Sequence, residues 1–270
     1  MHMIVRRVIQ PRWRIGIVEN SLEGIVNGEE LRVQWPSNPF HDRWFADPFV
    51  LSVNGNEVTL LVEDFRYKDG KGRISRIIVD MERNSIVSCK TILDGGHYSF
   101  PAILRKDNKI FVYPERGPQG RLEMFEYDVE NDVCKFVETL SEDVVPDAII
   151  YDGRVFAMNE QWNILVEKTI DKESMQIIDA KSREYIFDEC IARNAGDFFE
   201  CGGTVYRPAQ ECNRWYGNAL SIQKYEDGAF TEVRRIPGMH TLNSYQGVTA
   251  VDRKVFPFQW VYWLLRRSDK

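Results

Sequence analysis

The sequence is poor in the features that mark metal-binding, disulfide-rich and membrane-spanning proteins. None of its five cysteines lies in a CxxC pair, so we expect free thiols packed in strands, with no zinc site and no disulfide framework. No window approaches the roughly 18 consecutive apolar residues of a membrane span, and the first residues lack the apolar core of a signal peptide. These absences predict a cytoplasmic protein without a membrane span.

Basic charge and helical periodicity are also scarce. The 270 residues include 35 Lys and Arg side chains against 41 Asp and Glu, which gives a net charge of −6. Phosphate binding needs a concentrated basic surface, so this balance argues against a nucleic-acid partner. Helical periodicity is pronounced nowhere, and residues 171–182 are the one stretch expected to hold a helical turn.

A short pattern recurs five times along the chain. Each copy places a turn-forming residue and an apolar run ahead of a polar hinge and a second apolar strand. Aligned on their second residues, the copies step by 53, 46, 49 and 51 residues. A near-constant period of about 50 residues with several short strands per unit is typical of a β-propeller. The aligned residues are Pro48, Pro101, Asp147, Gly196 and Gly247.

Within each unit the sequence predicts antiparallel strands joined by tight turns. In the second unit, residues 100–105 and 110–113 form strands around a turn at residues 106–109, and residues 122–127 alternate apolar and polar side chains. The other first turns are expected at Asn54-Gly55, Asp152-Gly153, residues 201–203 and Asp252-Arg253. The other third strands are expected to begin near Ile74, Ile164, Ala219 and Tyr262.

These features predict one all-β domain over residues 1–270, a five-bladed β-propeller whose blades start near residues 46, 99, 145, 194 and 245. A β-sandwich is the alternative fold. Because an open ring would leave exposed strand edges, we expect the strand at residues 13–18 to close the ring by pairing with residues 255–263.

Propeller geometry predicts where a ligand would bind. The start of the first strand and the end of the second strand of each blade reach the same rim of the central channel, which is the default ligand site. Polar or charged residues occupy these positions in all five units. First-strand starts supply Asp47, His97, Ser99, Asp147, Arg193, Asn194, His240 and Asn243, and second-strand ends supply Glu63, Asp64, Glu115, Asn159, Glu160, Arg207, Gln210 and Gln259.

Each of these residues alone also has a structural explanation. Asp47 could cap a turn, and His97 could be a loop or core histidine. Glu115 could form a local ion pair, and Arg207 could pair with Glu63 or Glu115 across the channel. Convergence at one rim is what favours a site. Aromatic residues near the rim suit either stacking on sugar rings or packing between blades: Trp44, Phe45, Tyr98, Trp215 and Tyr216.

Several of these segments resemble the five-bladed propeller domain at the N-terminal side of plant glucosamine inositolphosphorylceramide transferases and of related bacterial proteins. That domain is in turn similar to the propellers of glycoside hydrolase family 43 and of families 32, 62 and 68. The 270 residues leave no room for a glycosyltransferase domain, so transferase activity does not follow. The resemblance spans residues 13–263 and is carried by residues 44–49, 97–102, 113–115, Asp147, 192–196, 206–210 and 216–217.

The hydrolase comparison implies roles for individual residues. Family 43 enzymes place a general-base Asp in the first blade, an orienting Asp in the third and a general-acid Glu in the fourth. Asp47 and Asp147 stand at the first two positions, but the fourth-blade position falls in residues 193–196, which hold no carboxylate. Glu115 is the available substitute for the acid, provided that burial raises its pKa.

Two functions are therefore expected for an axial carbohydrate pocket. The first is glycosidase-like, possessing the catalytic residues Asp47, Asp147 and Glu115. The alternative is a non-catalytic glycan-recognition module associated with polysaccharide or glycolipid glycosyltransferases, in which Arg193 and Arg207 contact the carboxylate or phosphate of an anionic sugar. No cofactor or metal ligand set is predicted, and an axial cation and the oligomeric state stay open. The expected ligand-binding residues are His97, Ser99, Glu63, Arg193, Arg207, Gln210, Tyr216 and His240.

Overall fold

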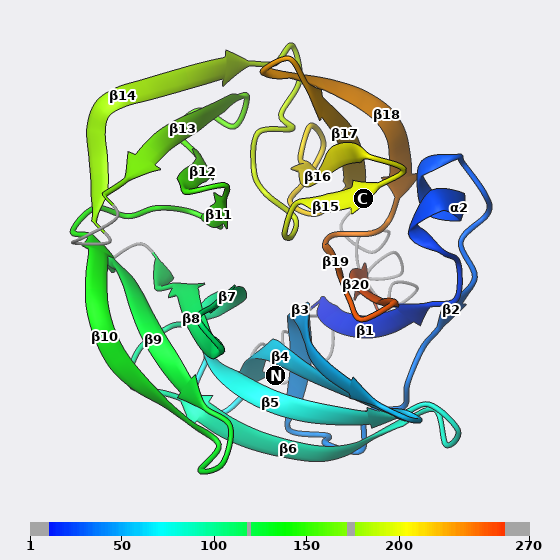
Figure 1. Cartoon of the computed structure of the whole chain (residues 1–270). Helices are drawn as coiled ribbons and strands as arrows, with labels where there is room; N and C mark the ends of the chain where they lie inside the picture. Colours follow the sequence, from blue (N-terminus) through cyan, green and yellow to red (C-terminus); the bar gives the residue numbers. More distant parts are fainter. Residues whose placement is uncertain (1–10, 118–119, 172–175, 257–270) are drawn as a thin grey trace, which may run out of the picture.

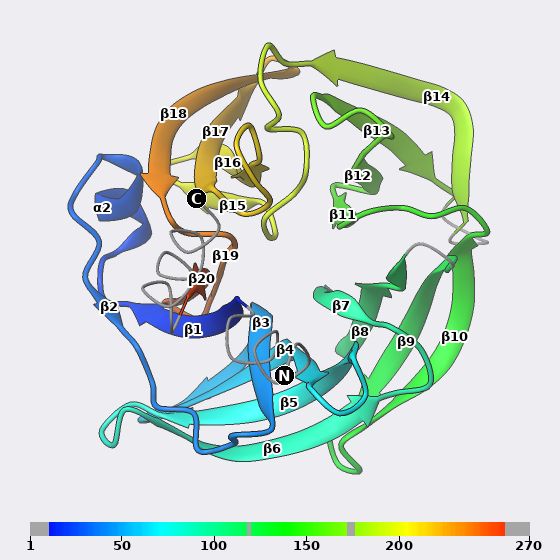
Figure 2. The same cartoon turned by 180° about the vertical axis from the view of Figure 1, so that it is seen from behind.

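Five four-stranded antiparallel sheets surround a common axis in the computed structural model, which describes residues 11–117, 120–171 and 176–256 (Figure 1). This arrangement confirms the all-β, five-bladed propeller expected from the sequence. In each blade one strand lies next to the axis and the others follow outward, and the view from behind shows the same inner strands around the axis (Figure 2).

The blades follow one another along the chain. Blade one contains β3 (Arg43–Asn54), β4 (Glu57–Arg66), β5 (Lys71–Asp80) and β6 (Ser85–Leu93). Blade two contains β7 (Ser99–Lys106), β8 (Lys109–Glu115), β9 (Leu122–Asp128) and β10 (Val133–Ser141). Blade three contains β11 (Ile149–Tyr151), β12 (Arg154–Met158), β13 (Ile164–Ile170) and β14 (Ile177–Ile186). Blade four contains β15 (Phe199–Cys201), β16 (Thr204–Glu211), β17 (Ala219–Glu226) and β18 (Ala229–Pro237).

Blade five closes the ring by combining both ends of the chain. From the axis outward it contains β19 (Leu242–Tyr245), β20 (Val248–Val255), β1 (Arg12–Val18) and β2 (Val33–Gln34). β1 pairs antiparallel with β20, from Arg12 opposite Val255 to Val18 opposite Thr249. Closure by the N-terminal strand is thus confirmed. Its partner is β20, however, and not the expected segment 255–263, most of which lies outside the described residues, as does Tyr262.

The hairpin of blade five corrects the sequence interpretation. The turn between β19 and β20 falls at Gln246 and Gly247, whose φ angles are 50° and 76°. The expected turn at Asp252-Arg253 is wrong, because both residues lie within β20. Gly247, on which the sequence alignment places the first strand of the fifth repeat, thus lies in the turn after that strand. Gln259, the predicted end of the second strand, lies outside the described residues. The first turns of blades one to four contain positive φ angles, as expected, at Gly55, Asp107, Asn108, Asp152, Gly153, Gly202 and Gly203.

A single short helix, α2 (Leu22–Val26), occurs among the described residues and connects β1 to β2. Its N-cap is Ser21, whose Oγ accepts a hydrogen bond from the Gly24 N–H at 3.1 Å. The helical turn expected within residues 171–182 is not found in the described part of that stretch, where β14 begins. Nowhere in the described ranges is a helix long and apolar enough to cross a bilayer.

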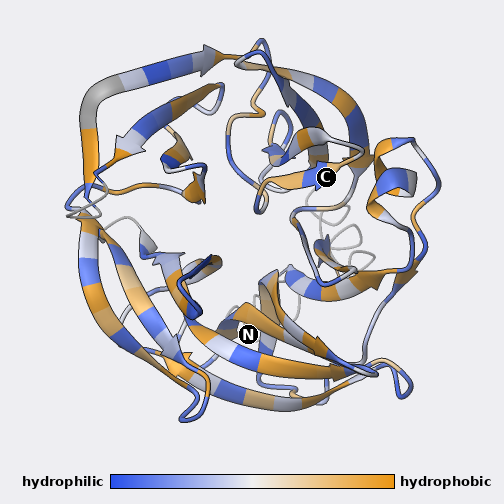
Figure 3. Cartoon of the chain, viewed as in Figure 1, coloured by the Kyte–Doolittle hydropathy of each residue, from blue (hydrophilic) through white to orange (hydrophobic). Residues whose placement is uncertain are grey.

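The hydrophobic core lies between the blades. Successive residues of a strand point to opposite faces of the sheet, so a strand covered by a blade on each side is apolar throughout. In β4, Leu60 packs in a cluster with Ile17 of blade five, whereas Leu61 packs in a cluster with Phe100 of blade two. Hydrophobic and hydrophilic segments alternate along the ribbons of the outer strands (Figure 3). This packing holds the inner strands around the axis.

Candidate functional site

Two aspartates on the innermost segments of blades one and three share an unusual backbone conformation. Asp47 and Asp147 have φ angles of 49° and 41°, and Phe100 of blade two has 47°. A positive φ outside glycine costs about 1–3 kcal/mol and is retained where the surrounding structure holds it. The strand register shifts at Asp47 and at Phe100, as in a β-bulge, which turns the side chain out of the ladder.

Hydrogen bonds join Asp47 to blades two and five. The Asp47 N–H donates to Asp252 Oδ2 at 3.0 Å, and the Phe100 N–H donates to Asp47 Oδ2 at 3.1 Å. His240 Nδ1 lies 3.2 Å from Asp252 Oδ2 and 3.4 Å from Asp47 Oδ1. Thr241 donates to Asp252 Oδ1 through its N–H at 2.9 Å and its hydroxyl at 2.8 Å. The three ionisable side chains are all buried, which makes their protonation states interdependent.

The environment separates the pKa values of these groups. Burial raises the pKa of Asp47 to about 7, against the opposing attraction of His240. Burial acts to lower the pKa of His240, but the charge of Asp252 outweighs it and the pKa is raised. Burial likewise acts to raise the pKa of Asp252, but His240 and the donated hydrogen bonds lower it. His240 and Asp252 therefore favour an ion pair, and Asp47 titrates near neutral pH.

The same three residues are the group of potential metal ligands found among the described residues. Asp47, His240 and Asp252 each offer one atom, and these atoms all lie within 4.8 Å of one another. Calcium takes about 6–8 oxygen ligands, so a cation here would need most of its ligands from water or a bound molecule. The imidazole Nδ1 already bridges the two carboxylates, so the group is also held together without a cation.

A second set of contacts joins blades two, three and four around Asp147. Arg193 Nε donates to Asp147 Oδ2 at 2.5 Å, and Arg193 Nη2 donates to Glu115 Oε2 at 3.0 Å. Gln210 Nε2 donates to Asp147 Oδ2 at 2.7 Å, and the Asp147 N–H donates to Glu115 Oε2 at 3.0 Å. The Arg193 guanidinium thus donates hydrogen bonds to two carboxyl groups, and the Asp147 carboxylate compensates its positive charge.

Glu115 and Asp147 differ in protonation although they are neighbours. Burial raises the pKa of Glu115 to about 8, and the charge of Asp147 adds to the rise, whereas Arg193 opposes it. Burial also acts to raise the pKa of Asp147, but the ion pair with Arg193 outweighs it and the pKa is lowered. At neutral pH Glu115 therefore favours the acid form and Asp147 the carboxylate. Burial, with Asp47 and Glu115 nearby, also raises the pKa of Glu63.

Two aromatic rings cover this polar centre. The Tyr216 ring lies 5.0 Å from the His240 ring, and Arg193 Cζ lies 5.1 Å from the Tyr216 ring centre. The Trp13 ring lies 4.2 Å from the His240 ring. Tyr216 is 36 % exposed, yet its hydroxyl is close enough to the acidic groups for burial and their charges to raise its pKa. We name as the axial cluster Asp47, Glu63, Glu115, Asp147, Arg193, Gln210, Tyr216, His240 and Asp252.

Three polar atoms of the axial cluster are buried and have no hydrogen-bond partner among the described residues. They are Asp47 Oδ1, Gln210 Oε1 and His240 Nε2. A buried polar group without a partner costs about 1–3 kcal/mol, so such atoms are rare in native proteins unless a bound molecule satisfies them. Asp47 Oδ1 and Gln210 Oε1 can accept a hydrogen bond from a hydroxyl group, whereas Nε2 of a protonated His240 donates one to a hydroxyl oxygen.

Other predicted site residues lie beside the cluster. Ser99 lies opposite Glu115 in the ladder between β7 and β8. His97 Nδ1 accepts a hydrogen bond from the Gly72 N–H at 2.9 Å, and burial lowers the pKa of His97. A Cβ on Gly72 would lie 2.3 Å from Glu63 Oε1, so His97 and Glu63 share Gly72 as a neighbour. Neither the His97 nor the Ser99 side chain forms a hydrogen bond with a side chain of the cluster among the described residues.

Arg207 is not in the axial cluster, which corrects the expectation that it contacts a ligand. Its Nε donates to Asn194 Oδ1 and its Nη1 to Gln223 Oε1, both at 2.7 Å, and its Nη2 donates to the Ala192 carbonyl. It forms no ion pair with Glu63 or Glu115 within the described chain. Burial lowers the pKa of Arg207 to about 9. This fully buried side chain fixes the segment before blade four.

Two residues of the site were missed by the sequence interpretation. The sequence interpretation places Asp252 in a turn because it aligns the fifth repeat on Gly247. With the turn at Gln246-Gly247, Asp252 falls on the second strand of blade five. Trp13 comes from the closing strand β1, which lies outside the repeat pattern. Nothing in the sequence marked it as a neighbour of His240.

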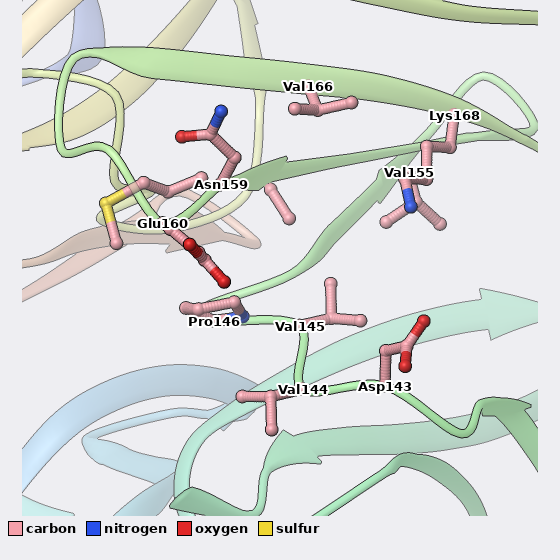
Figure 4. A pocket seen from close by; sticks show the side chains of 11 residues that line it. Asp143, Val144, Val145, Pro146, Val155, Asn159, Glu160, Val166 and Lys168 are labelled. Atoms are coloured by element: carbon pink, nitrogen blue, oxygen red, sulfur yellow. The ribbon is translucent and has the colours of Figure 1, made fainter. Parts of the chain in front are cut away.

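A separate pocket of about 490 Å³ lies beside blade three (Figure 4). Its wall is largely apolar and includes Val144, Val145 and Val155, with Asn159 and Glu160 at one side. Pro146 also lines this pocket and precedes Asp147 in the chain. No member of the axial cluster lines it, so we do not assign it to the site.

Solved GH43 enzymes share the five-bladed propeller fold of this chain. The chain is similar to a GH43 β-xylosidase/α-arabinofuranosidase from a compost microbial metagenome, with a TM-score of 0.54 and 13% identity over 77% of this chain and 84% of that chain. It is also similar to a GH43_1 enzyme from Xanthomonas citri complexed with xylotriose, with a TM-score of 0.55 and 10% identity over 80% and 88% of the two chains. At such identities the likeness shows the fold alone.

Sequence comparison leads to particular relatives. The chain is 25% identical over 248 residues to glucosamine inositolphosphorylceramide transferase 1 of Oryza sativa, in both subspecies indica and japonica. The match covers 80% of this chain and 32% of the transferase, so the chain spans about a third of the length of these relatives. No family model matches the chain. The resemblance expected from the sequence is thus confirmed on both sides.

Proposed function

We propose that the axial cluster binds carbohydrate. The observation that carries this proposal is the set of three buried polar atoms without hydrogen-bond partners among the described residues, on Asp47, Gln210 and His240. Sugar hydroxyl groups would donate hydrogen bonds to the Asp47 and Gln210 oxygens and accept one from the His240 Nε2–H, and the Tyr216 ring offers an apolar face for the sugar ring. Two solved structures with the same fold are described as complexes with xylose and xylotriose, which supports this ligand class.

Recognition without turnover of simple glycosides is the form of this function that we favour. The position of the family 43 acid in blade four falls within residues 193–196, which hold no carboxylate, and Arg193 binds both Asp147 and Glu115. Asp147 and Glu115 are also hydrogen-bonded within the protein, which suits a rigid binding site. The module would then act beside glycosyltransferases of polysaccharide or glycolipid synthesis.

Glycoside hydrolysis is the second candidate, and one observation favours it. Glu115 has a pKa of about 8 beside an ionised Asp147, the separation that lets one carboxyl group act as acid while another stays charged. In this mechanism Glu115 protonates the leaving oxygen, Asp47 activates water as the general base, and Asp147 orients the acid. Asp47 has a pKa of about 7, so activity would require a pH between the two values.

Calorimetry with xylotriose and a hydrolysis assay with an aryl α-L-arabinofuranoside distinguish these functions. For the binding module we expect xylotriose affinity to fall about tenfold in Asp47→Asn and in Gln210→Ala, since each loses an acceptor for a hydroxyl group. Asp152→Asn is a matched control, because Asp152 also has a positive φ but lies exposed in the β11–β12 turn. No turnover is expected from the unsubstituted protein.

Robust turnover by the unsubstituted protein would instead support the hydrolase. Asp47→Asn and Glu115→Gln should then each reduce turnover by about 10²–10⁴-fold while sugar binding is retained. If neither sugar binding nor turnover is detected, the carbohydrate proposal fails.

A further inference from the structure

A second cleft lies beside the axial cluster, where blade five meets blade one. It has a volume of about 230 Å³ and is lined by the start of β1, the segment 36–41, the start of β3, the residue after β4 and the end of β20. β1 and β3 lie side by side in both views of the ring (Figures 1 and 2). This volume suits one sugar residue or a phosphate group better than a larger ligand. We name it the β1–β3 cleft, with the lining residues Arg12, Trp13, Arg14, Phe40, Trp44 and Tyr67.

The β1–β3 cleft carries positive charge that the described protein does not compensate. Arg43 in its wall is paired with Asp42 and Asp64, but Arg12 and Arg14 form no ion pair within the described ranges. Arg14 Nη2 donates to the Trp35 carbonyl at 2.8 Å, which leaves its charge in place. Two uncompensated guanidinium groups in one cleft are notable in a chain whose net charge is −6.

Neighbouring residues of β20 add to this charge. Arg253 lies opposite Arg14 in the ladder and Lys254 lies opposite Trp13. Neither forms an ion pair with a described residue, and Lys254 Nζ lies 5.6 Å from the Trp13 ring centre. Val255 is the β20 residue that lines the cleft, and Arg253 lies near enough to Arg14 that burial and the Arg253 charge together lower the pKa of Arg14.

Arg12 has an unused hydrogen-bond donor. Its Nε is buried and has no hydrogen-bond partner among the described residues, and its Cζ lies 5.4 Å from the centre of the Tyr67 ring. A guanidinium held against an aromatic ring keeps its edge free for a planar or tetrahedral anion. A bound carboxylate or phosphate would satisfy both the charge and the donor.

Trp13 connects the cleft to the axial cluster. It is one of the residues that line the β1–β3 cleft, and its ring lies 4.2 Å from the His240 ring. We propose that the β1–β3 cleft binds the acidic group, carboxylate or phosphate, of a sugar residue adjoining the one held in the axial cluster. This inference rests on the proposed carbohydrate function and names the ligand as an acidic glycan. The sequence predicted that Arg193 and Arg207 contact the anion. In the structure Arg193 is paired with carboxyl groups and Arg207 is buried away from the cluster, so we assign the anion contact to Arg12 and Arg14.

Calorimetry with four probes tests the inference: xylotriose, xylotriose bearing a glucuronic acid residue, a sugar phosphate and inorganic phosphate. We expect the glucuronic acid derivative to bind at least tenfold more tightly than xylotriose, with an advantage that shrinks as salt concentration rises. Arg12→Gln and Arg14→Gln should abolish this advantage and leave xylotriose affinity unchanged. Arg83→Gln, an exposed arginine 77 % accessible at the outer turn of blade one, is the matched control. Comparison of the carboxylate and phosphate probes identifies the anion.

Each outcome separates this inference from the proposed function. Equal affinity for the acidic and neutral oligosaccharides would overturn the acidic-glycan inference and leave the carbohydrate function standing. Binding of inorganic phosphate that depends on Arg12, without binding of any sugar, would support the anion site and overturn the carbohydrate function. Absence of both overturns both. If Arg12→Gln does not fold, Arg12→Lys keeps the charge without the planar fork, and we expect it to retain only part of the advantage.

Discussion

Identical side-chain types acquire different properties in the axial cluster because their partners differ. Asp47 and Asp252 are both buried aspartates of one hydrogen-bonded group, yet the pKa of Asp47 is raised to about 7 and that of Asp252 is lowered. Asp252 receives donors at both oxygens, whereas Asp47 Oδ1 has no hydrogen-bond partner among the described residues. The partners of each carboxylate, and not the residue type, therefore separate the two pKa values, since Asp47 Oδ1 has only His240 Nδ1 at 3.4 Å.

Stability should depend on pH through Glu115. Its pKa is about 8 in the folded protein and roughly 4.3 when unfolded, so the folded state holds an extra proton between these values. Its contribution to stability is therefore fully present below about pH 4 and is lost as pH rises towards 8. We expect Glu115→Gln, which cannot ionise, to flatten the fall in the free energy of unfolding between pH 5 and 8, measured by urea denaturation.

The exposed Glu200→Gln is the control for this measurement, since Glu200 lies on blade four away from the cluster. Parallel stability curves for the unsubstituted protein and Glu115→Gln would contradict the assignment of the raised pKa to Glu115.

The structure brings together Asp47, Glu115, Asp147 and His240, four of the residues that the sequence assigns to strand ends at the axis. Their roles toward a ligand stay a prediction. Arg207 and Gln210 were both assigned to the site from one strand, although alternation places residues three apart on opposite faces. Gln210 contacts Asp147, so Arg207 points away from it. Applying the alternation would have excluded one of the two.

At the scale of elements, the close contact of blades four and five depends on one glycine. Gly196 has a φ of 154°, and a Cβ there would lie 2.0 Å from the Leu242 carbonyl oxygen at the start of β19. We expect Gly196→Ala to lower the free energy of unfolding by about 3 kcal/mol or more, because the obstacle is backbone and cannot rotate away. Thermal and urea denaturation would measure the loss.

Gly203→Ala provides the matched comparison. Gly203 has a φ of 74°, but a Cβ there meets nothing within 4 Å, so only the conformational cost of about 1–2 kcal/mol applies. Equal losses in the two variants would show that the contact with Leu242 is unimportant.

Turn chemistry determined how well the elements could be predicted. Four of the first turns contain Gly, Asn or Asp residues that adopt the positive φ that a hairpin needs, and they were located correctly. In blade five the repeat alignment placed the turn at Asp252-Arg253, whereas the structure has it at Gln246-Gly247. The side-chain contacts of Asp252 with His240 and Thr241, which the sequence does not reveal, hold it within β20.

At the scale of the whole molecule, stability should depend on the closing strand. β1 is the third strand of blade five and lies between β20 and β2. Deleting the residues before Glu19 would expose the edge of β20 and the side chains packed against Ile15 and Ile17. We expect a marked fall in melting temperature, and partial recovery when a synthetic peptide of residues 11–18 is added. An unchanged melting curve would show that ring closure does not limit stability.

The number of blades could be predicted from the sequence because the repeat occurs five times. The contacts within the axial cluster could not be predicted in full. The period fixes how many sheets form, whereas the pairing of Asp252 with His240 and the position of Trp13 arise from contacts between the two ends of the chain. Such contacts leave no periodic trace.

Ring closure also determines how the protein would respond to a mechanical load. Arg12 and Val255 lie opposite each other, so the chain enters β1 and leaves β20 at the same end of their ladder. A force that separates these two points loads the hydrogen bonds one after another, starting with the pair at Arg12, and does not shear the whole ladder at once. The propeller would therefore open from this seam under a modest pull, and the seam borders both the β1–β3 cleft and, through Trp13, the axial cluster.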